Sequence, residues 1–129
     1  MNVVKKKTRT TVRLTVVGMQ HRVTLSLRMM LQGYVENAPL VCYLKREPDN
    51  PKDENAIRVM AWGDPYRHLH VGYLSRHVAE IWAPLMDAGK LIVKYACLVE
   101  VDPREGDGEI SIVVSATKDA KEWIRQQPH

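Results

Sequence analysis

The chain of 129 residues contains no phenylalanine, and its tyrosines and tryptophans make up only 6% of it. It has two cysteines, which excludes a fold held together by several disulfides. No apolar run approaches the roughly 18 residues that a membrane-spanning helix needs. The basic N-terminus is not followed by the apolar stretch of a signal peptide. We therefore expect a soluble, cytoplasmic protein with no membrane span.

The sequence also lacks the common motifs of catalysis and metal binding. It has no phosphate-binding loop, no nucleophile elbow and no H-E-x-x-H or C-x-x-C pairing. His68 and His70 lie two residues apart with His77 further on, but neither Cys42 nor Cys97 has a Cys or His partner nearby in the sequence. We therefore expect no enzyme activity, no metal and no cofactor. Both cysteines lie within apolar stretches, which predicts buried free thiols.

The basic residues are concentrated near the N-terminus. Residues 1–28 carry seven basic and no acidic side chains, whereas the other 101 residues carry 12 basic and 15 acidic ones, a net charge of −3. A local polycation attracts polyanions, chiefly nucleic acid, because each neutralised phosphate releases condensed counterions. The lysine-rich arm, including Lys5, Lys6 and Lys7, extends a DNA-binding surface in one interpretation and only aids solubility in the other.

Several short β-branched or apolar runs bounded by turn residues predict strands. They lie at residues 11–17, 40–46, 55–61, 69–74, 91–101 and 109–116. A helix is expected after Ser75, because Val78, Ile81, Trp82 and Leu85 share one face, with Gly89 at its end. Pro84 should kink this helix or shorten its last turn.

A second helix is expected in KDAKEWIRQQ, where Trp123 and Ile124 would pack. Residues 21–37 mix strand-like and helix-like patterns, and we expect Met29, Met30 and Leu31 to lie in the core. The predicted fold is α+β and mainly β: a small OB-like or SH3-like barrel of five to six strands with two helices. Residues 1–10 would form a basic arm, 11–117 the barrel domain, and 118–129 a C-terminal helix and tail.

Three stretches in order resemble the HIRAN domain family: VVGMQHR at 16–22, LKREPDNPKDENAIRVM at 44–60 and HVGYLSRHVAEIWAPLMDAGK at 70–90. The middle stretch is the most specific, with a strand ending in Arg-Glu-Pro, an Asn-Pro-x-Asp turn and Asn-Ala-Ile opening the next strand. The match covers about residues 12–116. The resemblance implies a small barrel that binds DNA, notably single-stranded DNA at a 3′ end, in DNA repair or replication-fork processing. A helicase or a nuclease is a candidate partner, and the oligomeric state is not readable from the sequence.

The resemblance also assigns roles to individual residues. Asp53 matches the family's carboxylate that contacts the 3′ hydroxyl, and Arg76 matches its phosphate-binding cation. The residues alone leave alternatives open: Asp53 can instead cap its own turn, and Arg76 can be an ordinary solvated side chain.

The sequence departs from the family where better-studied members place an arginine and two aromatic residues. Gln20 brings neither charge nor ring, whereas His21 can stack and Arg22 can supply the guanidinium. Lys52 replaces an aromatic residue, and Tyr73 occupies a position where the family often has an aromatic residue or histidine. These differences predict weaker base stacking and a larger share of phosphate contact.

A protein-interaction adaptor is the alternative function. Such a module would recruit a nuclease, helicase or replication factor without binding DNA itself, since one small-barrel fold serves both purposes. It predicts an exposed apolar patch, from residues 23–34, and binding that is indifferent to salt.

Overall fold

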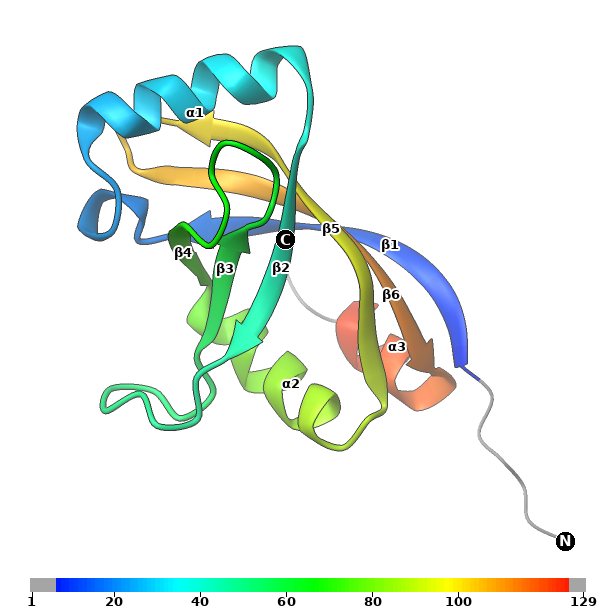
Figure 1. Cartoon of the computed structure of the whole chain (residues 1–129). Helices are drawn as coiled ribbons and strands as arrows, with labels where there is room; N and C mark the ends of the chain where they lie inside the picture. The colour runs from blue at the N-terminus through cyan, green and yellow to red at the C-terminus, as the bar shows by residue number, and fades with distance from the viewer. Residues whose placement is uncertain (1–6, 126–129) are drawn as a thin grey trace, which may run out of the picture.

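Six antiparallel strands close into a barrel in the computed structural model, which describes residues 7–125 (Figure 1). The order around the barrel is β1-β4-β3-β2-β5-β6, so β1 is hydrogen-bonded to both β6 and β4. Within the described range, no helix is both long and apolar enough to cross a bilayer. The strands are β1 (Lys7–Val17), β2 (Leu40–Arg46), β3 (Ile57–Ala61), β4 (His70–Leu74), β5 (Leu91–Asp102) and β6 (Asp107–Thr117).

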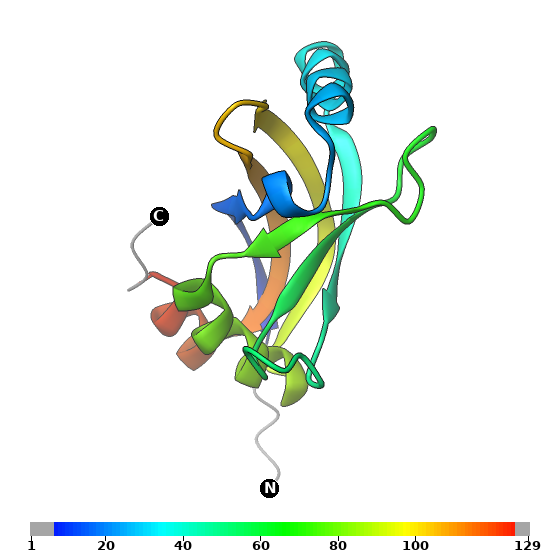
Figure 2. The ribbon, with the colours of Figure 1, turned by 90° about the vertical axis from the view of Figure 1, so that its left-hand side faces the viewer.

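Three helices and one short 3-10 turn accompany the strands of the described chain. They are η1 (Met19–His21), α1 (Leu25–Asn37), α2 (Arg76–Asp87) and α3 (Lys118–Arg125). Helix α1 lies over one end of the barrel, where it contacts β5, whereas α2 and α3 pack together at the other end (Figures 1 and 2). The predicted mainly-β small barrel is confirmed.

The prediction of two helices is wrong, because residues 21–37 contain the third. The side chain of Thr24 caps α1 by accepting a hydrogen bond from the backbone N–H of Leu27. Leu31 is fully buried, as predicted, but Met29 and Met30 are 58% and 59% exposed. The expectation for Met29 and Met30 is wrong because a helix that lies on the barrel turns only one face inward, and these two residues lie on its outer face.

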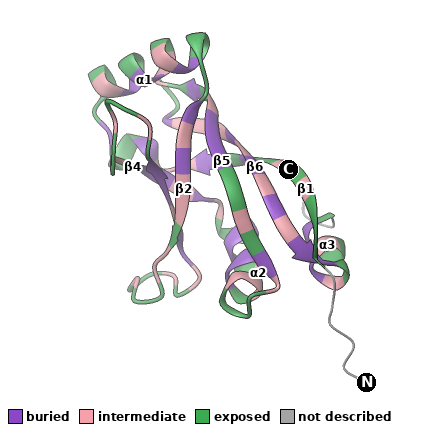
Figure 3. Ribbon diagram, turned by 45° about the vertical axis from the view of Figure 1, so that its right-hand side comes forward, coloured by how far each residue is buried: buried purple, intermediate pink, exposed green. Residues whose placement is uncertain are grey.

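Inward-facing residues of the strands fill the barrel interior, and Figure 3 shows buried residues alternating with more exposed ones along β2 and β6. Trp82 of α2 is completely buried and closes one end. Strand β4 comes so close to β1 that a Cβ on Gly72 would lie 2.6 Å from the carbonyl oxygen of Val17. Only glycine fits this position of the Gly-Tyr-Leu motif.

Some predicted boundaries shift. Strand β1 begins at Lys7 rather than at residue 11, so residues 7–10 belong to the barrel and not to an arm. Residues 1–6, with Lys5 and Lys6, and the tail 126–129 lie outside the described part of the chain. Helix α3 confirms the C-terminal helix, but of the two residues expected to pack only Ile124 is buried, since Trp123 is 56% exposed. Helix α2 runs through Pro84 to Asp87.

Both cysteines are free and buried, as predicted. Cys42 pairs with Ala96 and Val41 pairs with Cys97 across β2 and β5, so the two thiols point to opposite faces of the sheet. Burial raises the pKa of Cys42 to about 12 and also raises the pKa of Cys97, which keeps both thiols protonated.

Candidate nucleic-acid interface

The loop between β2 and β3 is a tightly hydrogen-bonded turn built around Asn50. Its side-chain oxygen accepts from the backbone N–H groups of Lys52, at 2.9 Å, and Asp53, at 3.1 Å. Asp53 in turn accepts from the N–H of Asn55 at 2.9 Å. The turn-capping interpretation of Asp53 is therefore correct for one carboxylate oxygen, Oδ1. These bonds explain why β3 begins at Ile57 and not at Asn55.

Arg46 fastens this loop to helix α2. Its guanidinium donates to the carbonyls of Ala56 and Glu54, at 2.8 and 3.0 Å, and to both carboxylate oxygens of Asp87, at 3.0 and 3.1 Å. A planar guanidinium suits this bidentate geometry. The loop and the helix consequently form one braced unit at the lower end of the barrel in Figure 2.

An open cleft of about 270 Å³ lies beside this unit. It has a small apolar floor, formed by Val17, Ala56 and Leu74, and polar walls. Five of the seven residues predicted for the site line it: Arg22, Lys52, Asp53, Tyr73 and Arg76. They come from four separate segments of the chain: the end of η1, the β2–β3 loop, β4 and the start of α2. With three cations and one carboxylate, the lining is positively charged.

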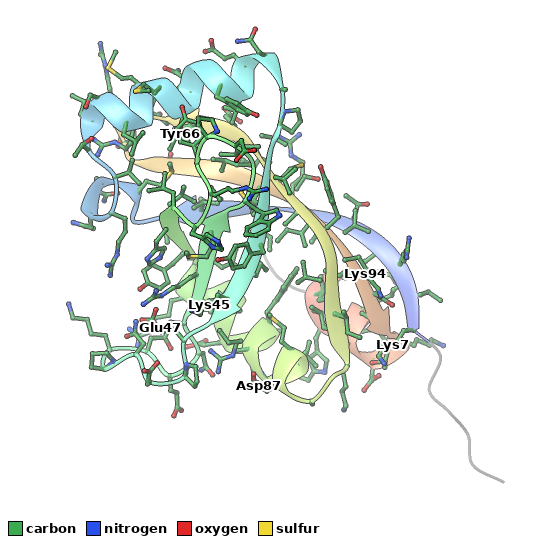
Figure 4. The ribbon with its side chains drawn as sticks, viewed as in Figure 1. Lys7, Lys45, Glu47, Tyr66, Asp87 and Lys94 are labelled. Carbon is green, nitrogen blue, oxygen red and sulfur yellow. The ribbon has the colours of Figure 1, made fainter. Side chains whose placement is uncertain are left out.

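A hydrogen-bonded network holds Tyr73 in the wall of the cleft. The carbon of the Arg22 guanidinium lies 5.6 Å from the ring centroid of Tyr73, and Nη2 of Arg22 lies 3.4 Å from its hydroxyl. The Tyr73 hydroxyl donates to Glu47, at 3.3 Å, and Glu47 also forms an ion pair with Arg58 and accepts from Asn50 at 2.7 Å. Figure 4 labels Glu47 at the lower end of β2, where the chain enters the loop.

His70 also contacts Tyr73, in an edge-to-face arrangement with ring centroids 4.8 Å apart. Burial lowers the pKa of His70 below 6.5, and the positive charges of Arg58 and Arg22 lower it further. The hydrogen bond between Nε2 of His70 and the carbonyl of Gly72, at 2.9 Å, acts in the opposite direction. His70 is therefore a neutral ring at pH 7.

This lowered pKa predicts that the fold weakens in mild acid. Between pH 6.5 and the lower pKa of the folded state, the unfolded chain binds more protons at this position. The contribution of neutral His70 to stability is thus present above pH 6.5 and is lost as the pH falls through its folded-state pKa. Urea unfolding at pH 7.5 and 5.5 measures how much the free energy of unfolding falls between these pH values. We expect this fall to be smaller for His70→Gln than for the wild-type chain. His21→Gln, at an exposed position, should keep the wild-type loss, and equal losses in both variants would contradict the assignment.

Gln20 and His21 do not line the cleft. Gln20 packs against the β5–β6 turn, where a Cβ on Gly106 would lie 2.8 Å from the backbone nitrogen of Gln20. Gly106 also accepts a hydrogen bond from the N–H of Met19, at 2.9 Å, which fixes η1 on that turn. His21 is exposed at the end of η1. Neither residue therefore belongs to the cleft lining, and their contact with nucleic acid stays a prediction.

Several residues that build the cleft were not predicted from the sequence. Glu47, Asn50 and Arg58 orient the wall residues, and His70 supports Tyr73. Glu47 and Asn50 lie inside the Arg-Glu-Pro-Asp-Asn segment, so the turn pattern already marked the region. His68 and His70 do not converge, since His68 lies against Tyr43 and Trp62 while His70 lies against Tyr73. Across residues 7–125, no three His, Cys, Asp or Glu side chains form a group that could hold a metal ion.

Comparison with protein families gives a match over residues 10–117, to the model described as the HIRAN domain. This confirms the resemblance inferred from the three sequence stretches. No curated protein sequence gives a significant match to the chain.

Solved structures share the fold. The crystal structure of the HIRAN domain of human HLTF is 21% identical, covers 87% of this chain and 80% of that one, and gives a TM-score of 0.62. A crystal structure of a Lactobacillus plantarum protein is 24% identical over 86% and 98% of the two chains, with a TM-score of 0.60. The NMR structure of the HLTF HIRAN domain in its DNA-bound conformation is 19% identical over 89% and 82%, with a TM-score of 0.57.

Proposed function

Because this chain belongs to the HIRAN domain family, we propose that it is a non-enzymatic module that binds DNA in the cleft between the β2–β3 loop and α2. The preferred ligand is single-stranded DNA, or a DNA 3′ end, in repair or replication-fork processing. A helicase or nuclease would act on the same DNA, in the cytoplasm and at the nucleoid if the source is bacterial. The HIRAN domain of HLTF, which shares the fold, has been described in a DNA-bound conformation.

The observation that carries this proposal is the convergence of charged and flat side chains on one small cleft. Arg22 and Arg76 are exposed cations on its walls, suited to phosphate oxygens. Arg76 is the first residue of α2, and the positive end of the helix dipole there also favours a phosphate. The ring of Tyr73, held by Arg22 and Glu47, offers a surface for a base.

Asp53 would supply discrimination at the strand end. Its Oδ1 is engaged by Asn55, which leaves Oδ2 for a terminal hydroxyl. A carboxylate accepts a hydrogen bond from a 3′ hydroxyl but repels a 3′ phosphate, so this position favours an unmodified end.

Fluorescence anisotropy tests the proposal with a labelled single strand bearing a 3′ hydroxyl, the same strand bearing a 3′ phosphate, and its duplex, each at two salt concentrations. We expect the 3′-hydroxyl strand to bind tightest and all binding to weaken as salt rises. Equal binding of all three ligands would mean that the protein recognises the phosphate backbone and not the 3′ end. No binding at low salt would contradict the DNA-binding proposal.

Changing Asp53 to Asn should remove end discrimination while leaving the turn intact, because asparagine keeps the oxygen that caps Asn55. We expect the ratio of affinities for the 3′-hydroxyl and 3′-phosphate strands to fall from about tenfold to about one, equivalent to about 1.4 kcal/mol. Asp49→Asn, in an exposed position of the same loop, is the matched control and should keep the ratio. An unchanged ratio in Asp53→Asn would remove the assigned role of this carboxylate.

A second candidate function is favoured by the exposed apolar face of α1. Leu25, Met29 and Met30 are 52%, 58% and 59% exposed, in the segment where the adaptor hypothesis expects a patch. Here we propose a contact with a helicase or nuclease. A photo-crosslinking residue at Met29 should capture such an enzyme in cells, and one at exposed Glu80 of α2 should not. Identical adducts from both positions would count against this role.

A further inference from the structure

Aromatic and basic side chains continue from the cleft across the outer face of β4, β3 and β2. We propose that this surface, the aromatic track, binds the internal nucleotides of the single strand whose end occupies the cleft. The inference rests on the proposed function and extends its footprint. The track consists of Tyr73, His70, Tyr43, Trp62 and His68, with Arg58, Lys45 and Arg67 as its cations.

Strand register makes the track continuous. In one row across β4, β3 and β2, Tyr73 pairs with Arg58, and Arg58 pairs with Lys45. In the next row across the same strands, His70 pairs with Met60, and Met60 pairs with Tyr43. Directly paired residues of neighbouring strands lie on the same face, about 5 Å apart. The two rows therefore connect the wall of the cleft to Tyr43 on β2.

The far end of the track is a cluster of three rings at the β3–β4 loop. The rings of Trp62 and His68 lie 4.9 Å apart, those of Trp62 and Tyr43 lie 6.0 Å apart, and the Tyr43 hydroxyl is 3.1 Å from Nδ1 of His68. His68 has a φ of 60°, a strained value for a residue with a side chain. Such a value persists where the surroundings hold a residue in place, and here the contacts with Tyr43 and Trp62 do so.

Trp62 remains accessible despite these contacts. Its side chain is 43% exposed, although its backbone N–H is fixed to the carbonyl of Val41 at 2.8 Å. A ring held by its neighbours loses little conformational freedom on binding, so the cluster presents Trp62 in a preformed position. The loop that carries Trp62 projects from the barrel near α1, away from the end that holds the cleft (Figure 2).

Charge identifies the ligand class. The guanidinium carbon of Arg67 lies 5.1 Å from the Trp62 ring centroid, and Arg67 also forms an ion pair with Asp64 at 3.0 Å. Arg58 likewise forms an ion pair with Glu47. Lys45 is exposed on β2, paired in register with Arg58. Rings interleaved with cations match unpaired bases linked by phosphates, whereas the bases of a duplex are stacked and inaccessible. Met60, in the middle of the track, is only 7% exposed, so the exposed surface of the track consists of rings and cations.

The test compares two strands with free 3′ hydroxyls, of about three and about twelve nucleotides, since sites of this kind cover about 4 to 16 nucleotides. The longer strand should bind the wild-type chain more tightly. Trp62→Leu should weaken binding of the longer strand about tenfold and leave the shorter one unchanged. Trp62→Tyr, which keeps a ring, should restore most of the affinity. Trp123→Leu is the matched control, because Trp123 is 56% exposed on α3 and lies outside the track.

Tryptophan fluorescence gives a second readout that does not depend on the folding of a Trp62 variant. In the Trp123→Leu chain the remaining tryptophans are Trp62 and the fully buried Trp82, so stacking on Trp62 should quench emission. We expect quenching by the longer strand and little by the shorter one.

The outcomes separate the two proposals. If the short strand binds but the long one is no tighter and causes no quenching, the track is wrong and the cleft stands. If Trp62→Leu weakens both strands equally, the residue acts through the fold and the track is again wrong. If Trp62→Leu binds the long strand as tightly as the wild-type chain does, Trp62 does not contact the strand and the track is wrong. If neither strand binds, the proposed DNA-binding function fails together with the track.

Discussion

A variant in which Arg22 and Arg76 are both changed to glutamine should bind single-stranded DNA about 100-fold more weakly than the wild-type chain at low salt. Each arginine stands on a different wall of the cleft, so each can donate to a different phosphate oxygen. Loss of one charge-assisted hydrogen bond worth about 1.4 kcal/mol lowers the affinity about tenfold. Two independent losses therefore lower it by the product of the two factors. Anisotropy titration over a series of salt concentrations should also show a shallower salt dependence, by about two counterions.

The control for this variant keeps the same change of net charge. Arg104→Gln with Arg125→Gln removes two cations from the β5–β6 turn and from α3, neither of which lines the cleft. If binding depends on the cleft, the control should lose far less affinity. Equal losses in the two double variants would mean that DNA is attracted only by overall charge.

Changing Glu47 to Gln should lower the free energy of unfolding by about 2 kcal/mol. The side chain of Glu47 is only 13% exposed, and it joins three partners: Arg58, Asn50 and Tyr73. Glutamine keeps the shape and one acceptor, but it leaves the guanidinium of Arg58, whose side chain is 33% exposed, without its carboxylate. Urea unfolding followed by circular dichroism measures the change. A loss of this size would mean that the Glu47 network stabilises the fold in addition to ordering the site.

Glu80→Gln is the matched control, since Glu80 is exposed on α2. It should change the free energy of unfolding by less than about 0.5 kcal/mol, as surface substitutions generally do. A change of the same small size in Glu47→Gln would show that the Glu47 network orders the cleft without stabilising the chain.

The strands could be predicted from the sequence because local signals agree there. Alternating β-branched residues mark 11–17 and 40–46, and prolines in the 48–53 turn cannot take part in a strand ladder. Helix α1 gave conflicting signals, since its first residues alternate like a strand. What decides its structure is the Thr24 cap and the burial of Leu31 against the barrel, and neither burial nor a partner element can be read from a local pattern.

The candidate site was predictable to the extent that its residues lie in sequence motifs. Arg22, Lys52, Asp53, Tyr73 and Arg76 all lie in the three stretches that resemble the family, and the structure brings them together. The position of Gln20 depends on Gly106, which lies more than 80 residues further along the chain. The pairing of Glu47 with Arg58 depends on the register of β2 and β3. Contacts of this kind exist only after the barrel has closed.

The brace formed by Arg46 has a consequence for how a strand end would be captured. One side chain joins the loop that carries Lys52 and Asp53 to the last turn of the helix that begins at Arg76. The two walls of the cleft are thus spaced before any ligand arrives. The site is therefore pre-organised, and the protein loses little conformational entropy when a ligand binds. We therefore expect binding without closure of the cleft, with nearly superimposable backbones in the free and DNA-bound states.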